Sequence, residues 1–443
     1  MSPSATPPAA LDLVARDLAA VWHPFTQHSQ WPSDDPLLID RASGVFLFDG
    51  DGNRYLDGVA SLWVTVHGHG EPAINAAIHA QLERLDHSTF LGLTHEPGIR
   101  VAEELLEVAP AGMGKVFFAG DGSSAAEAAI KMAYQAATQR GENRPLYLHC
   151  AEGYHGDTLG AVALGGIELF HATYRPLLIR TRTVSSPGVL APGQPRVARA
   201  AEVLAEMRSL LEQDGPQVCA VVVEPLIQAA GGMLTHDPSF LVGVRRLCDE
   251  FGAAMLVDEV ATGIGATGTW FAVDQAGVTP DLMVVGKRLT GGVLPLSAVI
   301  AREDVYQAFL GSPDSGRTFF HGHTYTANPL SCAAALANLS LMRARGTVDR
   351  AAAIGERIGA ALESVGKYDG VAEVRRVGTM TGVQVHPVGE RTGFEVCRAA
   401  RRRGVIIRPL GDVVVLMPPL GITDDELDEL TGVVDESVRE VVQ

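Results

Sequence analysis

The chain of 443 residues is long enough for a substantial core in two or three domains, and its apolar fraction of 47% and charged fraction of 20% are ordinary for a globular protein. Its formal net charge of −17 argues against nucleic acid or an anionic membrane as a partner, because both would repel it. The five cysteines are scattered and form no C-x-x-C pair, so we expect reduced thiols and neither a disulfide framework nor a zinc site.

The first ten residues are rich in proline, alanine and serine, with neither a basic start nor an apolar run. They predict a frayed tail and no signal peptide. The strongest apolar runs, such as Ala220–Val223 and Leu282–Val285, are far too short to cross a bilayer. We therefore expect a cytoplasmic protein.

In chain order, the predicted elements begin with a β-hairpin, in which Val45–Phe48 and Tyr55–Leu56 flank a turn of Asp, Gly and Asn at 49–53. From residue 71 onward, helical patterns alternate with short apolar strands. We predict helices at 71–85, 99–108, 123–140, 197–212 and 237–250, and strands at 115–119, 146–149, 218–223, 254–257 and 282–285. This alternation predicts an α/β fold with a mainly parallel sheet.

Beyond the last of these strands, a helical segment at 326–345 has the character of a connector. An α+β block follows at 349–443, and we expect it to pack with the N-terminal hairpin as a second, smaller domain. The predicted division is residues 1–60 as the N-terminal segment of the small domain, 61–330 as the large domain and 331–443 as the C-terminal small domain.

Three chemically conspicuous segments end apolar strands, which is where ligands bind in open α/β sheets. In the first, a strand enters the glycine-rich turn Gly120-Asp121-Gly122-Ser123 and then a helix in which Ser124 and Glu127 fit a capping box. Unpaired N–H groups at such a helix start favour a phosphate. The alternative is an ordinary capped turn, and the phosphate interpretation requires the Asp121 carboxylate to point away.

The second segment ends the strand 254–257 with Asp258. This carboxylate suits the partner of a pyridinium nitrogen, and it also suits the metal-binding acid of a P-loop ATPase. The ATPase needs G-x-x-x-x-G-K followed by a hydroxyl residue. Ala109 replaces the first glycine before Lys115, Asp281 replaces it before Lys287, and no hydroxyl residue follows either lysine. The sequence therefore disfavours the ATPase.

The third segment places Lys287 at the end of the very apolar strand 282–285. A lysine can extend from such a strand end into solvent, or it can be a Schiff-base lysine whose pKa burial depresses. A phosphate turn, a strand-terminal Asp and a strand-terminal Lys are together what pyridoxal 5'-phosphate requires. Tyr154, in Gly153-Tyr154-His155-Gly156-Asp157, is a candidate for covering the face of its ring.

Two histidine pairs suggest metal ligands at first sight. His67-Gly68-His69-Gly70 and His321-Gly322-His323-Thr324 have no cysteine or acidic cluster of matching spacing beside them. We interpret the first pair as a turn entering the next helix and the second as part of a loop, and we expect no metal site.

The segments 257–263 (VDEVATG) and 286–292 (GKRLTGG) resemble class III aminotransferases of fold type I, and the likeness covers about residues 20 to 425. Within this class, the chain is similar to the branch that aminates 8-amino-7-oxononanoate in biotin synthesis. Its further markers are Trp22-His23-Pro24-Phe25, Trp63 with the motif at 67–70, Leu93-Thr94-His95-Glu96-Pro97, the motif at 153–157, Glu224-Pro225, the motif at 321–324, and Arg408-Pro409 before Met417-Pro418-Pro419.

The resemblance implies a large domain with a mainly parallel seven-stranded sheet, a smaller α+β domain built from both termini, and a homodimer with active sites at the subunit interface. It implies that Lys287 forms the Schiff base and then moves a proton, that Asp258 pairs with the pyridinium and that Tyr154 stacks on the ring. Gly122 and Ser123 would bind the phosphate. Thr324 would join them from the other subunit. Arg408 would hold the substrate carboxylate, with Trp63 and Phe25 lining a pocket for the aliphatic chain.

The chain departs from the family pattern at three places. Ala266 stands where the motif after the Asp strand usually has arginine, and Gly120-Asp121 stands where Asp-Ser is common. Phe25 and Val64 replace a tyrosine and a second tryptophan of many members. S-adenosylmethionine and lysine both stay open as the amino donor, and Phe25, Val64 and Gly411-Asp412 favour lysine. The alternative activity is that of an ω-amino acid:pyruvate or 4-aminobutyrate aminotransferase.

Overall fold

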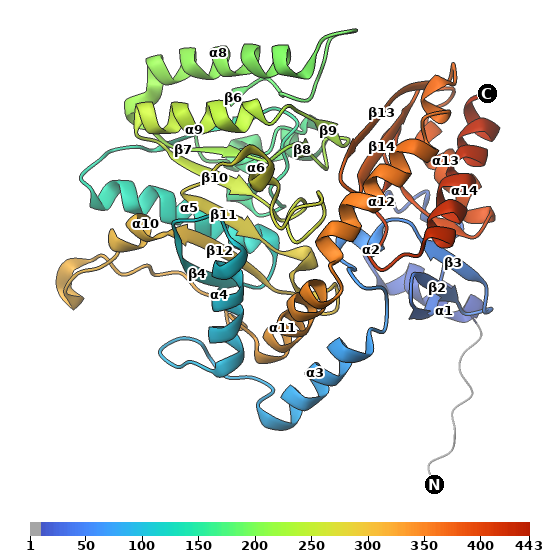
Figure 1. Ribbon diagram of the computed structural model, residues 1–443, viewed down its shortest axis with the longest axis horizontal. Coiled ribbons are helices and arrows are strands. Elements are labelled where there is room, and N and C mark those ends of the chain that lie inside the picture. Colours follow the sequence, from blue (N-terminus) through green and yellow to red (C-terminus); the bar gives the residue numbers. More distant parts are fainter. Residues whose placement is uncertain (1–9) are drawn as a thin grey trace.

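The computed structural model describes residues 10–443 of the chain (Figure 1). The stretch 1–9, which holds nearly all of the predicted frayed tail, lies outside the described residues. Between residues 10 and 443, no helix is both long enough and apolar enough to span a membrane.

A seven-stranded sheet forms the centre of the larger lobe. In spatial order its strands are β4 (Met113–Ala119), β12 (Ser297–Arg302), β11 (Leu282–Val285), β10 (Ala254–Asp258), β7 (Val218–Val223), β5 (Leu146–Cys150) and β6 (Thr181–Val184). β12 runs antiparallel to the other six strands of this sheet, which are parallel to one another. The predicted α/β class and mainly parallel sheet are confirmed.

The two faces of this sheet carry separate layers of side chains, because successive residues of a strand point to opposite faces. On one face, Tyr147, Val222 and Leu256 pack against the alanine-rich helix α5 (Gly122–Gln139), whose small side chains let the helix come close. On the other face, the sheet residues share a core with α4 (Glu96–Val108), α8 (Arg196–Asp214) and α9 (Ser239–Phe251). Both faces are covered, which explains why the strands are continuously apolar.

The smaller lobe combines both ends of the chain. Its C-terminal sheet has the order β13 (Val371–Val377), β14 (Met380–Val385), β17 (Val413–Leu416), β16 (Arg408–Leu410). A second sheet has the order β1 (Ile39–Ser43), β2 (Phe46–Asp49), β3 (Arg54–Asp57), β15 (Val405–Ile406). The helices are α12 (Thr347–Ala361), α13 (Thr392–Arg402) and α14 (Asp424–Val442), and α11 (Pro329–Ala344) leads into them.

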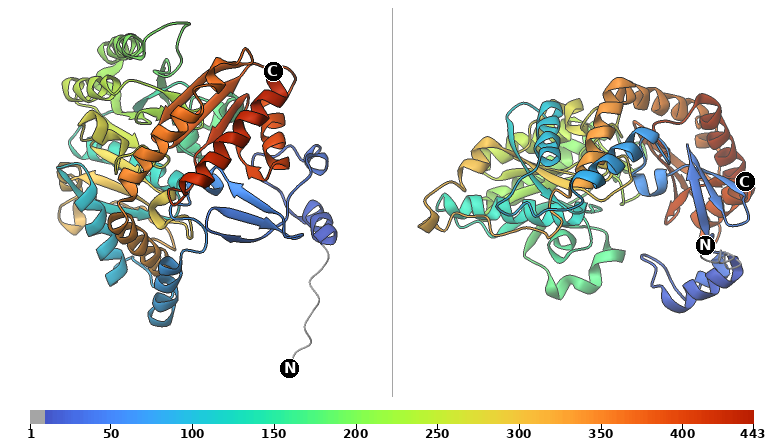
Figure 2. Two further views of the ribbon diagram at one scale, coloured as in Figure 1. Left: turned by 45° about the vertical axis from the view of Figure 1, so that its right-hand side comes forward. Right: turned by 90° about the horizontal axis from the view of Figure 1, so that it is seen from below.

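Figures 1 and 2 show the blue N-terminal strands beside the orange and red C-terminal elements in every view. The pairing of Leu56 in β3 with Val405 in β15 joins them through the backbone. This pairing supports the expected small domain built from both termini, whose division at residues 60 and 330 stays a prediction.

All ten helices and strands predicted between residues 71 and 285 occur, with ends shifted by at most three residues. The largest shift is at α4, which begins at Glu96 because Pro97 is tolerated in a first turn and the His95 ring accepts the Gly98 N–H. The predicted helix at 71–85 is α3 (Pro72–Arg84). Among the elements that the prediction lacked are β1, β6, β12 and the short helix α2 (Ala60–Trp63).

Candidate functional site

A cavity of about 460 Å³ opens at the carboxyl ends of the parallel strands. Five of its lining residues, Asp121, Tyr154, Glu224, Asp258 and Lys287, lie at or just after the ends of β4, β5, β7, β10 and β11, respectively. Its other lining residues are Trp63, Gly122, Ser123, His155, Gly156, Asp157, Thr158, Ala229, Ala230, Val260 and Ala261. The fold thus gathers the three conspicuous strand ends into one chamber.

Lys287 follows β11 with a left-handed backbone (φ 43°), and its Nζ lies 4.8 Å from the centroid of the Trp63 ring. Burial lowers the pKa of this lysine. The negative charges of Asp258 and Glu224 act in the opposite direction without overcoming burial. No carboxylate among the described residues forms an ion pair with it. The amine is therefore less firmly protonated than a surface lysine, which suits a nucleophile.

Asp258 is held rigidly at the end of β10. Nδ1 of His155 donates to Oδ2 of Asp258 at 2.8 Å, and the N–H of Val260 donates to Oδ1 at 2.9 Å. Burial alone would lower the pKa of His155, but the hydrogen bond and the charge of Asp258 outweigh it and raise the pKa. The two hydrogen bonds keep the Asp258 carboxylate facing a fixed direction.

The helix start at α5 differs from the predicted capping box. Asp121 is the N-cap: its Oδ1 accepts the N–H of Ser124 at 2.9 Å and its Oδ2 accepts the Ser124 hydroxyl at 2.8 Å. Glu127 instead accepts the N–H groups of Gly160 and Ala161, at 2.7 and 3.3 Å. The box of Ser124 and Glu127 was therefore wrong, because a residue outside the helix supplies the cap and the glutamate binds another segment.

The Asp121 carboxylate is directed back onto the first turn of its own helix. The N–H groups of Gly122 and Ser123, at the first two helical positions, have no acceptor among residues 10–443. They lie in the wall of the cavity. A helix start with two unused N–H groups is suited to bind an anion.

Thr158 joins this turn and was missed by sequence reasoning. The hydroxyls of Ser123 and Thr158 are 2.8 Å apart, and the Thr158 N–H donates to Ser123 Oγ at 3.1 Å. Gly156 permits this approach, because a Cβ at that position would lie 2.3 Å from Ser123 Oγ. No short sequence pattern links residues 123 and 158, which meet because α5 packs against α6 (Leu159–Leu164), the helix that follows Thr158.

Tyr154 is fixed by both of its polar ends. Its N–H donates to Glu224 Oε2 at 3.0 Å, and its hydroxyl donates to Asp157 Oδ2 at 2.9 Å. Burial and the nearby Asp157 carboxylate raise the pKa of the phenol, so it stays protonated. Glu224 is itself buried, which raises its pKa to about 7, and its other oxygen accepts the Ala229 N–H at 3.0 Å. The sequence drew attention to Glu224 only as part of a family marker.

The predicted substrate residues do not all line the chamber. Trp63 lines it, and its buried Nε1 has no acceptor among the described residues. Phe25 lies outside the lining and packs on Phe170. Arg408, at the start of β16, is half-buried and near enough for its charge to act on the Tyr154 phenol. Thr324 is exposed and does not line the cavity of its own chain.

The histidine pairs have structural partners. His69 donates from Nε2 to the buried Asp57 carboxylate at 2.9 Å, in the turn that precedes α3 as expected. His321 lies 3.0 Å from Nζ of Lys131. Residues 10–443 contain no group of three or more His, Cys, Asp or Glu side chains able to hold a metal ion.

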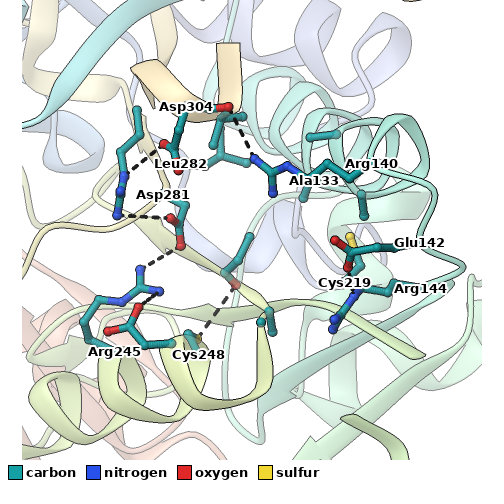
Figure 3. A pocket seen from close by; sticks show the side chains of 18 residues that line it. Ala133, Arg140, Glu142, Arg144, Cys219, Arg245, Cys248, Asp281, Leu282 and Asp304 are labelled. Carbon is teal, nitrogen blue, oxygen red and sulfur yellow. Dashed lines mark hydrogen bonds and ion pairs between the residues drawn. The ribbon is translucent and has the colours of Figure 1, made fainter. Parts of the chain in front are cut away.

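A second hollow of about 250 Å³ lies at the opposite ends of the strands, between α5 and α9 (Figure 3). Its charges are matched within the wall: Arg245 and Arg302 both pair with Asp281, and Arg144 pairs with Glu142 and donates to three backbone carbonyls. This hollow is therefore a structural junction.

Comparison with known proteins gives consistent matches over nearly the whole chain. A family model described as aminotransferase class-III matches residues 29–438. An adenosylmethionine-8-amino-7-oxononanoate aminotransferase of Nitratidesulfovibrio vulgaris is 46% identical, covering 99% of this chain and 84% of that protein. The protein of the same name from Geobacter sulfurreducens is 42% identical over 96% of this chain and 97% of its own.

Two solved structures are similar in fold. The adenosylmethionine-8-amino-7-oxononanoate aminotransferase of Methanocaldococcus jannaschii has a TM-score of 0.92 and 35% identity, covering 98% of this chain and 100% of that one. An (S)-enantioselective omega-transaminase of Thermomicrobium roseum has a TM-score of 0.93 and 31% identity, covering 98% and 99%.

Proposed function

Because the chain belongs to the class-III aminotransferases, we propose that it transfers an amino group from a small-molecule donor to 8-amino-7-oxononanoate, giving 7,8-diaminononanoate for biotin synthesis. Pyridoxal 5'-phosphate is the cofactor of this family. One observation carries the proposal: a lysine of lowered pKa, a fixed carboxylate and a helix start with two unused N–H groups face one chamber. The names of the relatives support the substrate.

The residues of the chamber fit the cofactor. Lys287 has a free amine, Asp258 presents an anchored carboxylate for the pyridine nitrogen, and the N–H groups of Gly122 and Ser123 suit the phosphate. Tyr154, held at both ends, has the place of a ring-stacking residue. When bound, the cofactor supplies an electron sink. Lys287 Nζ takes and returns the proton of the substrate carbon that carries the amine.

The substrate's carboxylate requires a cation away from the reacting end, and we assign this to Arg408. It forms no ion pair with a carboxylate of residues 10–443, so its guanidinium is available for bidentate binding. Trp63 and Phe25 supply apolar surface for the aliphatic chain.

At Ala266 the chain has no equivalent of the usual arginine. The alanine is fully buried in the core of the smaller lobe, and its carbonyl accepts both the N–H and the hydroxyl of Thr379 at 3.0 Å. The position is thus built into packing, and the chamber lacks that positive charge. We favour lysine as the donor on the sequence at Phe25, Val64 and Gly411, and S-adenosylmethionine is the alternative.

The functional unit in this proposal is a cytoplasmic homodimer. Thr324 is exposed and does not line its own chamber, which is what a residue that serves the partner's phosphate site requires. Each active site would then lie at the subunit interface.

The visible spectrum of the purified protein tests the proposal. We expect a yellow protein whose absorbance shifts to the amine form of the cofactor on addition of 7,8-diaminononanoate, and on addition of one donor when lysine and S-adenosylmethionine are supplied separately. A yellow protein whose absorbance does not change with diaminononanoate would agree with an aminotransferase but contradict the biotin-pathway substrate. A protein that cannot be made yellow with pyridoxal 5'-phosphate would contradict both parts of the proposal.

A second activity is favoured by the likeness to an omega-transaminase at a TM-score of 0.93. In that case an ω-amino acid or 4-aminobutyrate, with pyruvate as acceptor, would replace the oxononanoate. The same spectral assay with 4-aminobutyrate separates the two substrates.

A further inference from the structure

Three aromatic rings form a continuous path from the chamber to the surface. Tyr154 lines the chamber, and Phe170 meets it edge-on with ring centroids 6.3 Å apart and an interplanar angle of 82°. Phe25 meets Phe170 in the same manner, at 5.4 Å and 71°. Phe25 is 58% exposed as a residue, so the path ends at the surface.

The position of Phe170 is set by tight packing of the short helix α7 (Glu168–His171). A Cβ on Gly165 would lie 2.1 Å from the ring of His171, and a Cβ on Gly166 would lie 2.6 Å from Ala151 Cα. These two glycines let α7 lie flat on the loop that precedes Tyr154. His171 is buried and parallel to the Tyr154 ring, at 6.5 Å and 13°. Phe170 is therefore presented at a defined place.

Phe25 is held from the other lobe. Its segment is anchored by Asp34, whose carboxylate accepts two hydrogen bonds from Arg391 at 2.8 and 3.0 Å. Arg391 immediately precedes α13 of the smaller lobe, whereas Phe170 belongs to the larger one. Residues 25–34 thus form a bridge between the two lobes that ends on the Phe170 ring.

The inner chamber has both polar and apolar walls. The carboxylates of Asp121, Asp157, Glu224 and Asp258 line it, and hydrocarbon placed against them would displace their solvation. Trp63 contributes apolar wall to the chamber, and aromatic surface suited to a methylene chain continues outward along Tyr154, Phe170 and Phe25.

We propose that Phe170 is a specificity-determining residue, which together with Phe25 forms an aromatic gate that holds the aliphatic chain of the substrate while its amine end reaches Lys287. The inference rests on the proposed function, because it assumes a long-chain substrate. The nearby Leu169 is 88% exposed and takes no part in the gate.

The test compares two amines as donors to the bound cofactor, which for diaminononanoate is the reverse of the step that forms it. The loss of the yellow colour measures the reaction. 7,8-diaminononanoate has the full chain, and 2,3-diaminobutane has only its reacting end. Phe170→Ala is expected to raise the apparent Kd of diaminononanoate about tenfold, as for lost contacts in an apolar pocket, and to leave that of diaminobutane unchanged. Phe25→Ala should give the same pattern, and the double variant should lose less than the product of the two.

Leu169→Ala is the matched control and should change neither value. Unchanged binding of both amines by Phe170→Ala would overturn the gate, and so would an equal loss for both, since Phe170 would then act through Tyr154 on the reacting end. If the wild-type protein fails to react with diaminononanoate, the proposed function is wrong. The gate is then decided by 8-aminooctanoate against 4-aminobutyrate, with the Phe170→Ala loss expected for the longer amine alone.

Discussion

The lysine in the chamber has no fixed ionic partner among the described residues, and burial lowers its pKa against the pull of Asp258 and Glu224. If Lys287 is the cofactor-bearing residue, Lys287→Ala abolishes turnover and removes the yellow lysine-bound absorbance, while the fold is kept. Absorbance spectra with added pyridoxal 5'-phosphate, together with circular dichroism, measure both effects. Turnover at the wild-type rate would show that another group performs the chemistry.

The raised pKa of Glu224 predicts that the stability of the folded protein depends on pH. Burial raises its pKa from 4.5 to about 7, so the folded protein keeps a proton that the unfolded chain releases. Its contribution to stability is therefore present at low pH and is lost as the pH rises through about 7. The glutamine of the Glu224→Gln variant cannot ionise. Between pH 4.5 and 8, the free energy of unfolding of the wild-type protein should therefore fall by about 3 kcal/mol relative to that of the variant. Urea unfolding of both cofactor-free proteins measures this, and a difference independent of pH would contradict it.

In the proposed function, Arg408 binds the carboxylate of the substrate. Arg408→Ala should raise the KM for 8-amino-7-oxononanoate by roughly 10- to 100-fold, because a charge-assisted hydrogen bond is lost. The absorbance of the bound cofactor should not change. Steady-state kinetics against both substrates measure this, and an unchanged KM for the oxononanoate would remove the assigned role.

At this scale, the sequence predicted the residues that directly follow strands. Tyr154, Asp258 and Lys287 line the same chamber because the carboxyl ends of neighbouring strands meet. His155 and Phe170 were not assigned roles, because their contacts depend on which strands and loops lie side by side. The histidine that directly follows the conspicuous tyrosine was a signal that sequence reasoning left unused.

At the scale of elements, the start of α5 is closely packed against the loop that contains Gly156. Gly156 has φ 122°, and a side chain there would collide with Ser123. Gly156→Ala should therefore displace the pair of Ser123 and Thr158 and weaken binding of pyridoxal 5'-phosphate by at least about tenfold, with a lower Tm. Gly120→Ala is the control, because no atom lies within 4 Å of its added Cβ. Equal cofactor affinities in the two variants would contradict the phosphate role of this turn.

β12 and β6, two strands that the sequence failed to predict, were missed for different reasons. β12 lies between β4 and β11 and runs antiparallel to both, a direction that apolar content alone does not encode. β6 is a short edge strand whose sequence, Thr181–Val184, alternates polar and apolar residues weakly. The central strands were predictable because burial on both faces makes them uniformly apolar.

On the scale of the whole molecule, exposed apolar side chains occur on two neighbouring loops. Leu91 is 89% exposed and Phe320 82%, and the loops meet where the rings of His87 and Tyr325 lie 5.0 Å apart. If this surface is the dimer interface, Phe320→Asp should shift the protein toward monomers and reduce turnover, because Thr324 would leave the partner's site. Sedimentation velocity measures the shift. Leu169→Asp, an equally exposed change on α7, should leave the dimer intact, and a dimer unaffected by Phe320→Asp would place the interface elsewhere.

The pairing of β3 with β15 has a consequence for synthesis on the ribosome. Leu56 leaves the ribosome long before its partner Val405, and at about 5 to 20 residues per second the interval is roughly 20 to 70 seconds. During this time the N-terminal hairpin has an open edge and an uncovered apolar face, whereas the seven-stranded sheet needs nothing beyond β12. The nascent hairpin therefore keeps this open edge until β15, one of the last three strands of the chain, is translated.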